Sequence, residues 1–303
     1  MSNALSALTT RALSALDSAV IATASPSTQA DSPSLANPIE ISLLAAGICV
    51  LAVWILRRAA HPAKLSLART PGRHNSLHPG HIVGLLMLWL LAQGTVARIA
   101  GRFWPKESPQ PLVLAAMASQ VLWLVTVTLT AQLTFRLGLL RGFGLSLRHW
   151  VYDTGRGVMG YLAVLPVCAL LAWLPALWLK PEQMPTHFML LAMGKLSGWW
   201  QVAIIASAAV LVPLAEEMFF RGLLQSMLRR YFGRPWVAIV LTSTLFCLVH
   251  MPQWHTMGAL FALSVVLGYN YERCGRLYPA ILIHALFNAG NIVIWMTSSG
   301  QAG

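Results

Sequence analysis

Apolar runs long enough to cross a lipid bilayer recur along most of the chain. A membrane-spanning helix needs about 20 predominantly apolar residues, and eight stretches approach that length. Only 10% of the residues are charged, compared with about 25% in soluble domains. The sequence therefore predicts an all-α, polytopic membrane protein with spans at 41–56, 81–97, 111–135, 157–179, 197–215, 236–250, 257–271 and 277–297.

The basic residues lie mainly in alternate connections between these spans. Fifteen of the 21 lysines and arginines fall at 57–80, 136–156, 221–234 and 273–276. Because Lys and Arg gather on the cytoplasmic side of membrane proteins, this pattern predicts that both termini lie on the opposite side. Topology thus accounts for the net charge of +12, which gives no reason to expect a nucleic-acid partner.

Composition divides the chain into three parts. Residues 1–39 are rich in Ala, Ser, Thr and Pro and lack the hydrophobicity to build a core, so we expect a disordered N-terminal tail. Residues 40–180 hold the N-terminal transmembrane helices, and residues 197–297 form a second membrane part that carries most of the polar motifs. The four cysteines have no CxxC spacing, so we expect them to serve packing.

Ionisable side chains within the spans are concentrated in the last hundred residues. A charge at the centre of a bilayer costs about 2.5–3.5 kcal/mol on insertion scales, so such residues suggest a functional site. With about 1.5 Å of rise per residue, and Leu277 taken as the start of the last span, their depths are about 10–22 Å. We therefore expect them to meet in one cavity: Glu216, His250, His284 and Asn288.

Spacing indicates different roles for two neighbouring glutamates. Glu217 and Arg221 are four residues apart, with the acid N-terminal to the base, so we expect a structural ion pair. Glu216 is rotated by about 100° around the helix and has no cation at that spacing, which leaves it free to act as a base. Pro213 removes a backbone hydrogen bond, so we also expect the helix to kink there.

Two further pairs share a helix face. His250 follows Phe246 by four residues, and Asn288 follows His284 by four. A carboxylate, imidazole rings and an amide together suit the activation of water and the binding of an oxyanion.

Three motifs carry a family resemblance. The stretches AEEMFFRGLL, FCLVH and HALFN, in that order, look like the EExxxR, FxxxH and HxxxN motifs of the CAAX protease and bacteriocin-processing family of intramembrane proteases. The resemblance covers about residues 197–297 and implies a CAAX-protease-like catalytic core there. It implies a membrane-embedded endopeptidase, similar to type II CAAX prenyl endopeptidases, that hydrolyses membrane-associated, prenylated or leader-type peptides.

The resemblance also implies a role for each motif residue. Glu216 would activate water with the help of His250, while His284 and Asn288 would hold that water or stabilise the oxyanion. The remaining motif residues would shape the site: Glu217, Arg221 and Phe246.

The sequence leaves the use of a metal open. Glu216, His250 and His284 suit a zinc site with an open position for water, and the family is often described as metalloproteases. Asn288 lies one helical turn beyond His284, where an amide is a poor zinc ligand but a good donor to an oxyanion. We therefore favour a site that uses no cofactor.

The expected partners are a peptide or protein substrate and membrane lipid. We expect a multi-pass integral protein of a bacterial cytoplasmic membrane. Two other classes of function stay open, because intramembrane polar residues also serve transporters, and a protein of this kind can act as a noncatalytic membrane scaffold or immunity protein. The paired broken helices of many transporters are not found in the sequence.

Overall fold

The computed structural model describes residues 38–62, 66–67, 70, 75–103, 108–180 and 183–299. The helices of this part are α2 (Pro38–Ala60), α3 (Pro79–Ala100), α4 (Gln110–Thr134), α5 (Gly138–Phe143), α6 (Trp150–Trp173), α7 (Phe188–Lys195), α8 (Trp199–Ala206), α9 (Val212–Glu217), α10 (Ser226–Phe232), α11 (Pro235–Val249), α12 (Met257–Cys274) and α13 (Tyr278–Ser299). The described part contains no strand, so the all-α prediction is confirmed.

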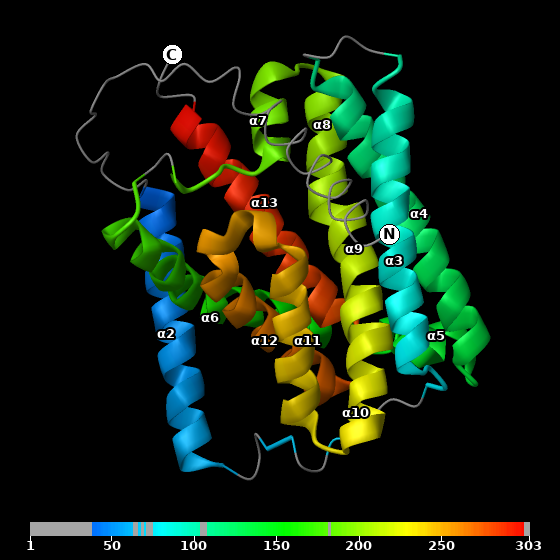
Figure 1. Ribbon diagram of the computed structural model, residues 1–303. Coiled ribbons are helices and arrows are strands. Elements are labelled where there is room, and N and C mark those ends of the chain that lie inside the picture. The colour runs from blue at the N-terminus through cyan, green and yellow to red at the C-terminus, as the bar shows by residue number, and fades with distance from the viewer. Residues whose placement is uncertain are drawn as a thin grey trace.

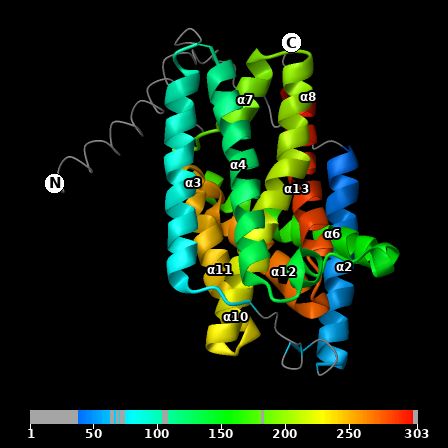
Figure 2. The same cartoon turned by 90° about the vertical axis from the view of Figure 1, so that its right-hand side faces the viewer.

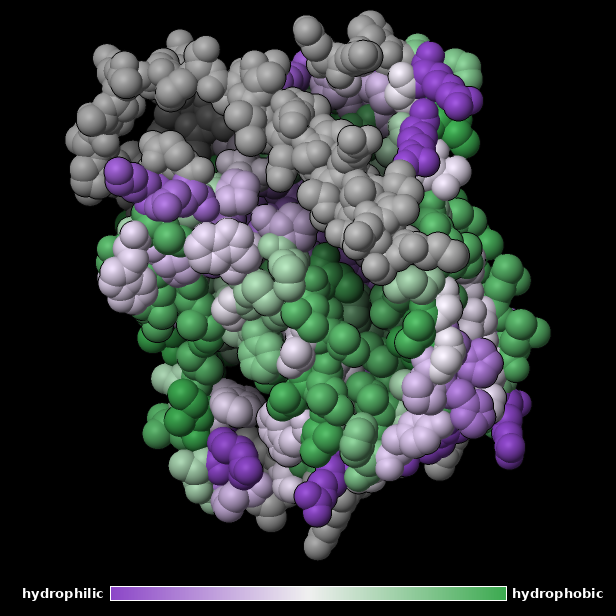
Figure 3. Space-filling view, in the orientation of Figure 1, coloured by the Kyte–Doolittle hydropathy of each residue, from purple (hydrophilic) through white to green (hydrophobic). Residues whose placement is uncertain are grey.

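Six helical runs of the described part are long and apolar enough to cross a membrane, and the longest joins α8, α9 and α10 over Trp199–Phe232. The other two expected spans correspond to α11, which is a shorter apolar helix of 15 residues, and to α12, which has 18 residues. Figure 3 shows hydrophobic residues across the middle of one face, with strongly hydrophilic residues above and below. The expected polytopic membrane fold is thus confirmed.

The boundaries of two segments differ from the sequence prediction. The expected tail, residues 1–39, lies outside the described residues except at its end, where α2 already begins at Pro38. The span expected at 157–179 begins earlier, because α6 starts at Trp150 and includes the polar residues that were assigned to a loop.

An ion pair explains why α6 extends through these polar residues. Asp153 is fully buried, and both its oxygens accept hydrogen bonds of 2.6 Å from Arg276, which lies between α12 and α13. This bidentate contact raises the pKa of Arg276. The pair fixes the start of α6 against the turn that precedes α13.

The helical run Trp199–Phe232 carries the EExxxR motif and lies at the centre of the fold, and we call it the central helix. Its residues Met218–Leu224 pack in the main apolar cluster together with side chains from α3, α4, α5 and α11. Helix α6 packs against α2 on one side and against α12 and α13 on the other. Figures 1 and 2 show α6 crossing the molecule at a steep angle to the other long helices.

The basic connections lie at one end of the molecule, which we call the basic end. It holds the links from α2 to α3, from α10 to α11 and from α12 to α13, whereas the start of α2 and the end of α13 lie toward the opposite end (Figure 1). The connection from α2 to α3 is tied to the central helix there, because Asn75 is buried and donates to the backbone of Leu223 at 3.1 Å.

A missing side chain lets α5 approach the central helix. Phe143 of α5 is fully buried, and a Cβ atom added to Gly222 would lie 2.2 Å from its ring. Gly222 is the glycine of the FFRGLL stretch. The glycine at this motif position is therefore explained by the closeness of two helices, as is common where membrane helices pack.

We expect Gly222→Ala to destabilise the protein. The clash with Phe143 forces a shift in a packed region, which typically costs about 1–3 kcal/mol. Thermal unfolding in a mild detergent measures the loss, and the double mutant with Phe143→Ala should show a smaller effect of the alanine. Gly94→Ala is the matched control, because a Cβ atom at Gly94 meets nothing within 4 Å; equal destabilisation by both alanines would contradict the explanation.

The position of the basic end predicts the orientation in the membrane. Both termini should face away from the cytoplasm. In a background without native cysteines, Ser32→Cys and Ser299→Cys should react with an impermeant maleimide in intact cells, and Ser66→Cys should not. Labelling of Ser66→Cys in intact cells would invert this orientation.

Candidate functional site

The central helix is irregular on both sides of α9. The segments Ser207–Leu211 and Met218–Gln225 are π-helical, although the whole run stays helical from Trp199 to Phe232. π-Helical turns occur often at functional sites. Where a kink was expected at Pro213, the helix widens into a π-helical segment just before the proline. The helical run then continues past Pro213.

Pro213 and the first π-helical segment together free a backbone carbonyl for Asn288. The N–H of Val212 bonds to Ser207, five residues back. In the same register the carbonyl of Ala208 would need an N–H from residue 213, which is a proline and has none. The side-chain amide of Asn288 donates to this carbonyl at 2.9 Å. Asn288 is thus held by a defect that Pro213 creates in the facing helix.

Glu217 has shorter polar contacts than Glu216, the other acid of the site. It is fully buried, and its Oε1 accepts from Nη1 of Arg221 at 2.7 Å and contacts Nδ1 of His284 at 2.9 Å. Arg221 is also fully buried, and its Nη2 donates to the backbone and side-chain oxygens of Ser264 on α12. The expected pair of Glu217 with Arg221 is present, and it extends to His284 and to α12.

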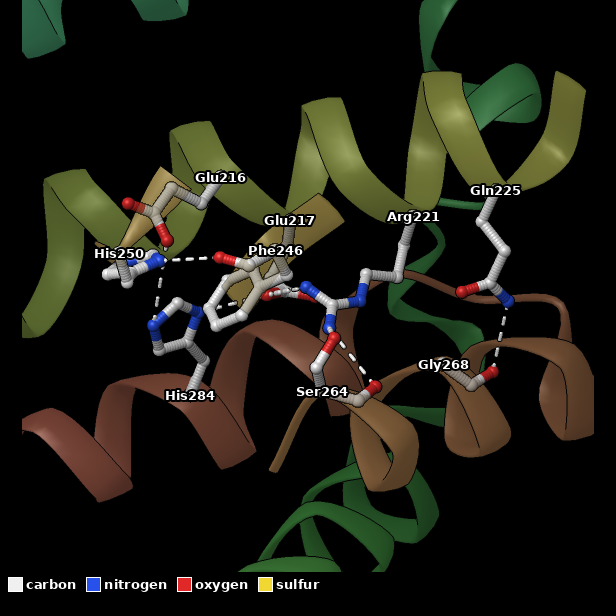
Figure 4. A network of polar contacts seen from close by, with 9 residues as sticks. All are labelled: Glu216, Glu217, Arg221, Gln225, Phe246, His250, Ser264, Gly268 and His284. Carbon is white, nitrogen blue, oxygen red and sulfur yellow. Dashed lines mark hydrogen bonds and ion pairs between the residues drawn. The ribbon is translucent and has the colours of Figure 1, made fainter. Parts of the chain in front are cut away.

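The same polar contacts continue toward the basic end. Gln225, one turn beyond Arg221, donates to the carbonyl of Gly268 at 3.2 Å and to Glu272 at 3.0 Å. Arg229, one turn further, lies 3.6 Å from Glu272. Figure 4 shows this row from Arg221 and Ser264 to Gln225 and Gly268. Every fourth residue of the central helix thus faces every fourth residue of α12.

Phe246 forms the wall against which the two histidines pack. Its ring lies 4.7 Å from that of His250, 5.9 Å from that of His284 and 5.1 Å from the guanidinium carbon of Arg221. Nδ1 of His250 lies 2.7 Å from the backbone oxygen of Phe246. A nitrogen this close to a carbonyl carries the proton, so Nε2 of His250 keeps the lone pair that accepts a proton.

Glu216 differs from Glu217 in having no strong partner. It is buried, and its Oε2 makes no hydrogen bond with the described part of the chain. The same oxygen lies 3.9 Å from Nε2 of His284. Figure 4 shows the Glu216 carboxylate and the rings of His250 and His284 gathered at one end of the polar network.

The structure therefore brings the polar motif residues into one region. His284 of α13 lies beside both glutamates, with Nδ1 2.9 Å from Oε1 of Glu217 and Nε2 3.9 Å from Oε2 of Glu216.

Sequence reasoning missed three contributors to this region. Neither Ser264 nor the carbonyl of Ala208 belongs to a recognisable motif. Ser264 contributes a hydroxyl from an otherwise apolar helix, and Ala208 contributes only a backbone oxygen. His187, before α7, was also missed. Burial, and to a smaller extent the nearby His250, lower its pKa to about 4, so its ring is neutral at pH 7.

The three side chains that suit zinc in the sequence gather in this region: Glu216, His250 and His284. Among the described residues, no three His, Cys, Asp or Glu side chains are close enough to hold a metal ion together. His284 instead contacts the two glutamates through its two ring nitrogens.

Comparison with known proteins shows a family similarity for this region. Residues 198–290 match the family model described as type II CAAX prenyl endopeptidase Rce1-like, and no solved structure matches the chain. A UPF0177 protein of Lactococcus lactis, YbdI, is 28% identical over 89 residues, which cover 29% of this chain and 46% of the relative. An uncharacterized 24.3 kDa protein of Escherichia coli is 32% identical over 78 residues, which cover 25% of this chain and 36% of the relative.

The chain thus spans less than half the length of the curated relatives that it matches. The family match supports a CAAX-type intramembrane protease in general, and it contains the polar region described above. Residues 198–290, which carry all three motifs, are therefore similar to the type II CAAX prenyl endopeptidase Rce1-like family.

Proposed function

We propose that this protein is an intramembrane endopeptidase in which Glu216 activates water for attack on a peptide bond. The observation that carries the proposal is the contrast between the two glutamates. Oε1 of Glu217 is paired with Arg221 at 2.7 Å and lies 2.9 Å from His284, whereas the Oε2 of Glu216 is approached only by Nε2 of His284, at 3.9 Å, among the described residues. A carboxylate that is held in place but not paired is suited to accept a proton from water.

The reaction follows from the contacts around Glu216. Water attacks the carbonyl carbon while its proton passes to Glu216, assisted by Nε2 of His250, and a tetrahedral oxyanion forms. Cleavage of the C–N bond then needs a proton on the leaving nitrogen, and Glu216 returns the one that it accepted. The products are a carboxyl group and an amine, so the protons balance without an additional acid.

We propose that His284 and Asn288 stabilise the oxyanion. Glu217 orients His284 through Nδ1, and Nε2 faces Glu216; in the protonated ring this nitrogen is a donor. Asn288 uses one of its two amide N–H groups on Ala208, which leaves the second for the substrate. Removing one such donor typically costs about 100-fold or more in kcat.

The depth of α11 suggests the side from which a substrate approaches. This helix has 15 residues and is therefore about 22 Å long, and it ends at His250. The segment Met251–Thr256 that follows lies below the far ends of α7 and α8 in Figure 1. We propose that substrates reach Glu216 from the end opposite to the basic end, or from the lipid beside it.

Cleavage of peptides by purified protein tests the proposal. A fluorogenic library of prenylated and leader-type peptides should yield products with the wild-type protein. Glu216→Gln should lower kcat by about 100-fold or more, because the amide keeps the shape but cannot accept the proton. Full activity in Glu216→Gln would remove the base assignment, and the scaffold and transporter alternatives predict no cleavage by either protein.

Glu217→Gln should have a different effect. It leaves Arg221 as a fully buried charge without its carboxylate, and breaking a buried pair in this way typically costs about 3–5 kcal/mol. We expect reduced protein yield and a lower unfolding temperature together with lost activity, whereas Glu216→Gln should retain normal yield and unfolding temperature. A stable, fully folded Glu217→Gln protein would contradict the structural role.

Metal removal tests the proposal that no cofactor is used. After dialysis against a chelator, the protein should keep its activity, and elemental analysis should find far less than one zinc per chain. One zinc per chain in active protein, with activity lost on removal and restored by added zinc, would overturn this part of the proposal.

A further inference from the structure

A hollow lies at the basic end, far along α11 from His250. It has a volume of about 300 Å³ and is lined by residues from α2, from the connection after it, and from the starts of α11 and the end of α12. The polar and aromatic residues used below are Trp54, Arg58, Arg234, Trp236 and Tyr269. Neither the motifs nor the proposed reaction involves this hollow.

Its electrostatic character is uniformly positive. Arg58 and Arg234 both line it, and none of the described lining residues is acidic. Arg58 donates one N–H to the carbonyl of Pro62 at 2.7 Å. Because an arginine has five N–H donors, others remain for a ligand. Two guanidinium groups that share a hollow without a carboxylate favour an anion between them.

The start of α11 adds to this positive field. The helix has 15 residues and begins at Pro235, and its N-cap residue, Arg234, forms no side-chain cap. The first N–H groups of a helix have no partner within the helix, and its N-terminus carries a partial positive charge. A phosphate placed between the arginines would therefore also face these N–H groups.

Aromatic rings form one wall of the hollow. Tyr269 lies edge-on to Trp54 at 5.9 Å and stacks on Trp236 at 6.0 Å. Trp and Tyr are enriched at the level of lipid headgroups. Since Arg58 is in the last turn of α2 and Pro235 is the first residue of α11, the hollow lies where the spans meet the water.

The packing of α2 indicates which phosphate compound fits. Helix α2 packs mainly against α6 and has the smallest buried share of the candidate spans. Trp54 of α2 contacts Tyr269 of α12 near the hollow. Apolar surface beside a basic hollow at the membrane boundary suits a molecule with both an anionic headgroup and acyl chains.

We propose that this hollow binds an anionic glycerophospholipid. Its phosphate lies between Arg58, Arg234 and the start of α11, and its acyl chains run beside α2. The bound lipid braces α2 against α11, and α11 carries His250 at its other end. The lipid thus acts as a structural ligand that holds the helix of one motif histidine.

Lipid-dependent thermal unfolding tests the proposal. Full-length protein in a neutral detergent is titrated with phosphatidylglycerol, phosphatidylcholine or inorganic phosphate, and the unfolding temperature is followed. Phosphatidylglycerol should raise it, and phosphatidylcholine should have little effect. Each arginine contributes about fivefold to the affinity for anionic lipid, so the Arg58→Gln, Arg234→Gln double variant should bind about 25-fold more weakly.

The control removes the same charge elsewhere on the basic end. Arg136 and Arg148 are exposed and do not line the hollow, so the Arg136→Gln, Arg148→Gln variant should respond as the wild type does. Equal weakening in both double variants would overturn the site in favour of general surface charge. Equal stabilisation by phosphatidylcholine would also overturn it, and stabilisation by inorganic phosphate at matching concentration would assign the hollow to free phosphate.

Discussion

The burial of Arg221 is the constraint on which the rest of the structure depends. A fully buried guanidinium is tolerated only where its charge is matched and its donors are used. Glu217 supplies the charge and Ser264 supplies oxygen acceptors from another helix. Because these partners come from the central helix and from α12, Arg221 fixes the register between the two. The row from Gln225 to Glu272 continues the same register toward the basic end.

The backbone of the central helix, like its side chains, contributes contacts to the neighbouring helices. Pro213 and the π-helical turn before it leave the Ala208 carbonyl available to Asn288, and Gly222 lets Phe143 pack directly against the helix. Each feature weakens an ideal helix, since proline and glycine are its poorest formers. Here the local loss is offset by contacts between helices, which in a bilayer rest on close packing and hydrogen bonds.

Much of the fold could be predicted from sequence because apolar length is a strong signal. The prediction failed where tertiary contacts decide the outcome. The start of α6 was assigned to the basic connection at 136–156, whereas the structure extends the helix into it, with Asp153 buried and paired with Arg276. The joint contact of Glu217 with Arg221 and His284 likewise required helices that are distant in the chain. The roles assigned to the motif residues stay predictions.

The two neighbouring glutamates show how one helix turn can produce unlike environments. Their side chains differ by about 100° in direction, so Glu217 faces Arg221 and His284 while Glu216 faces the half-buried region beside His250. Two unpaired carboxylates so close together in a medium of low dielectric would repel each other strongly. Arg221 removes that repulsion by matching the charge of Glu217. The ion pair therefore favours a negative charge on the adjacent Glu216, as its proposed role of base requires, even though Arg221 forms no contact with Glu216 in the polar network.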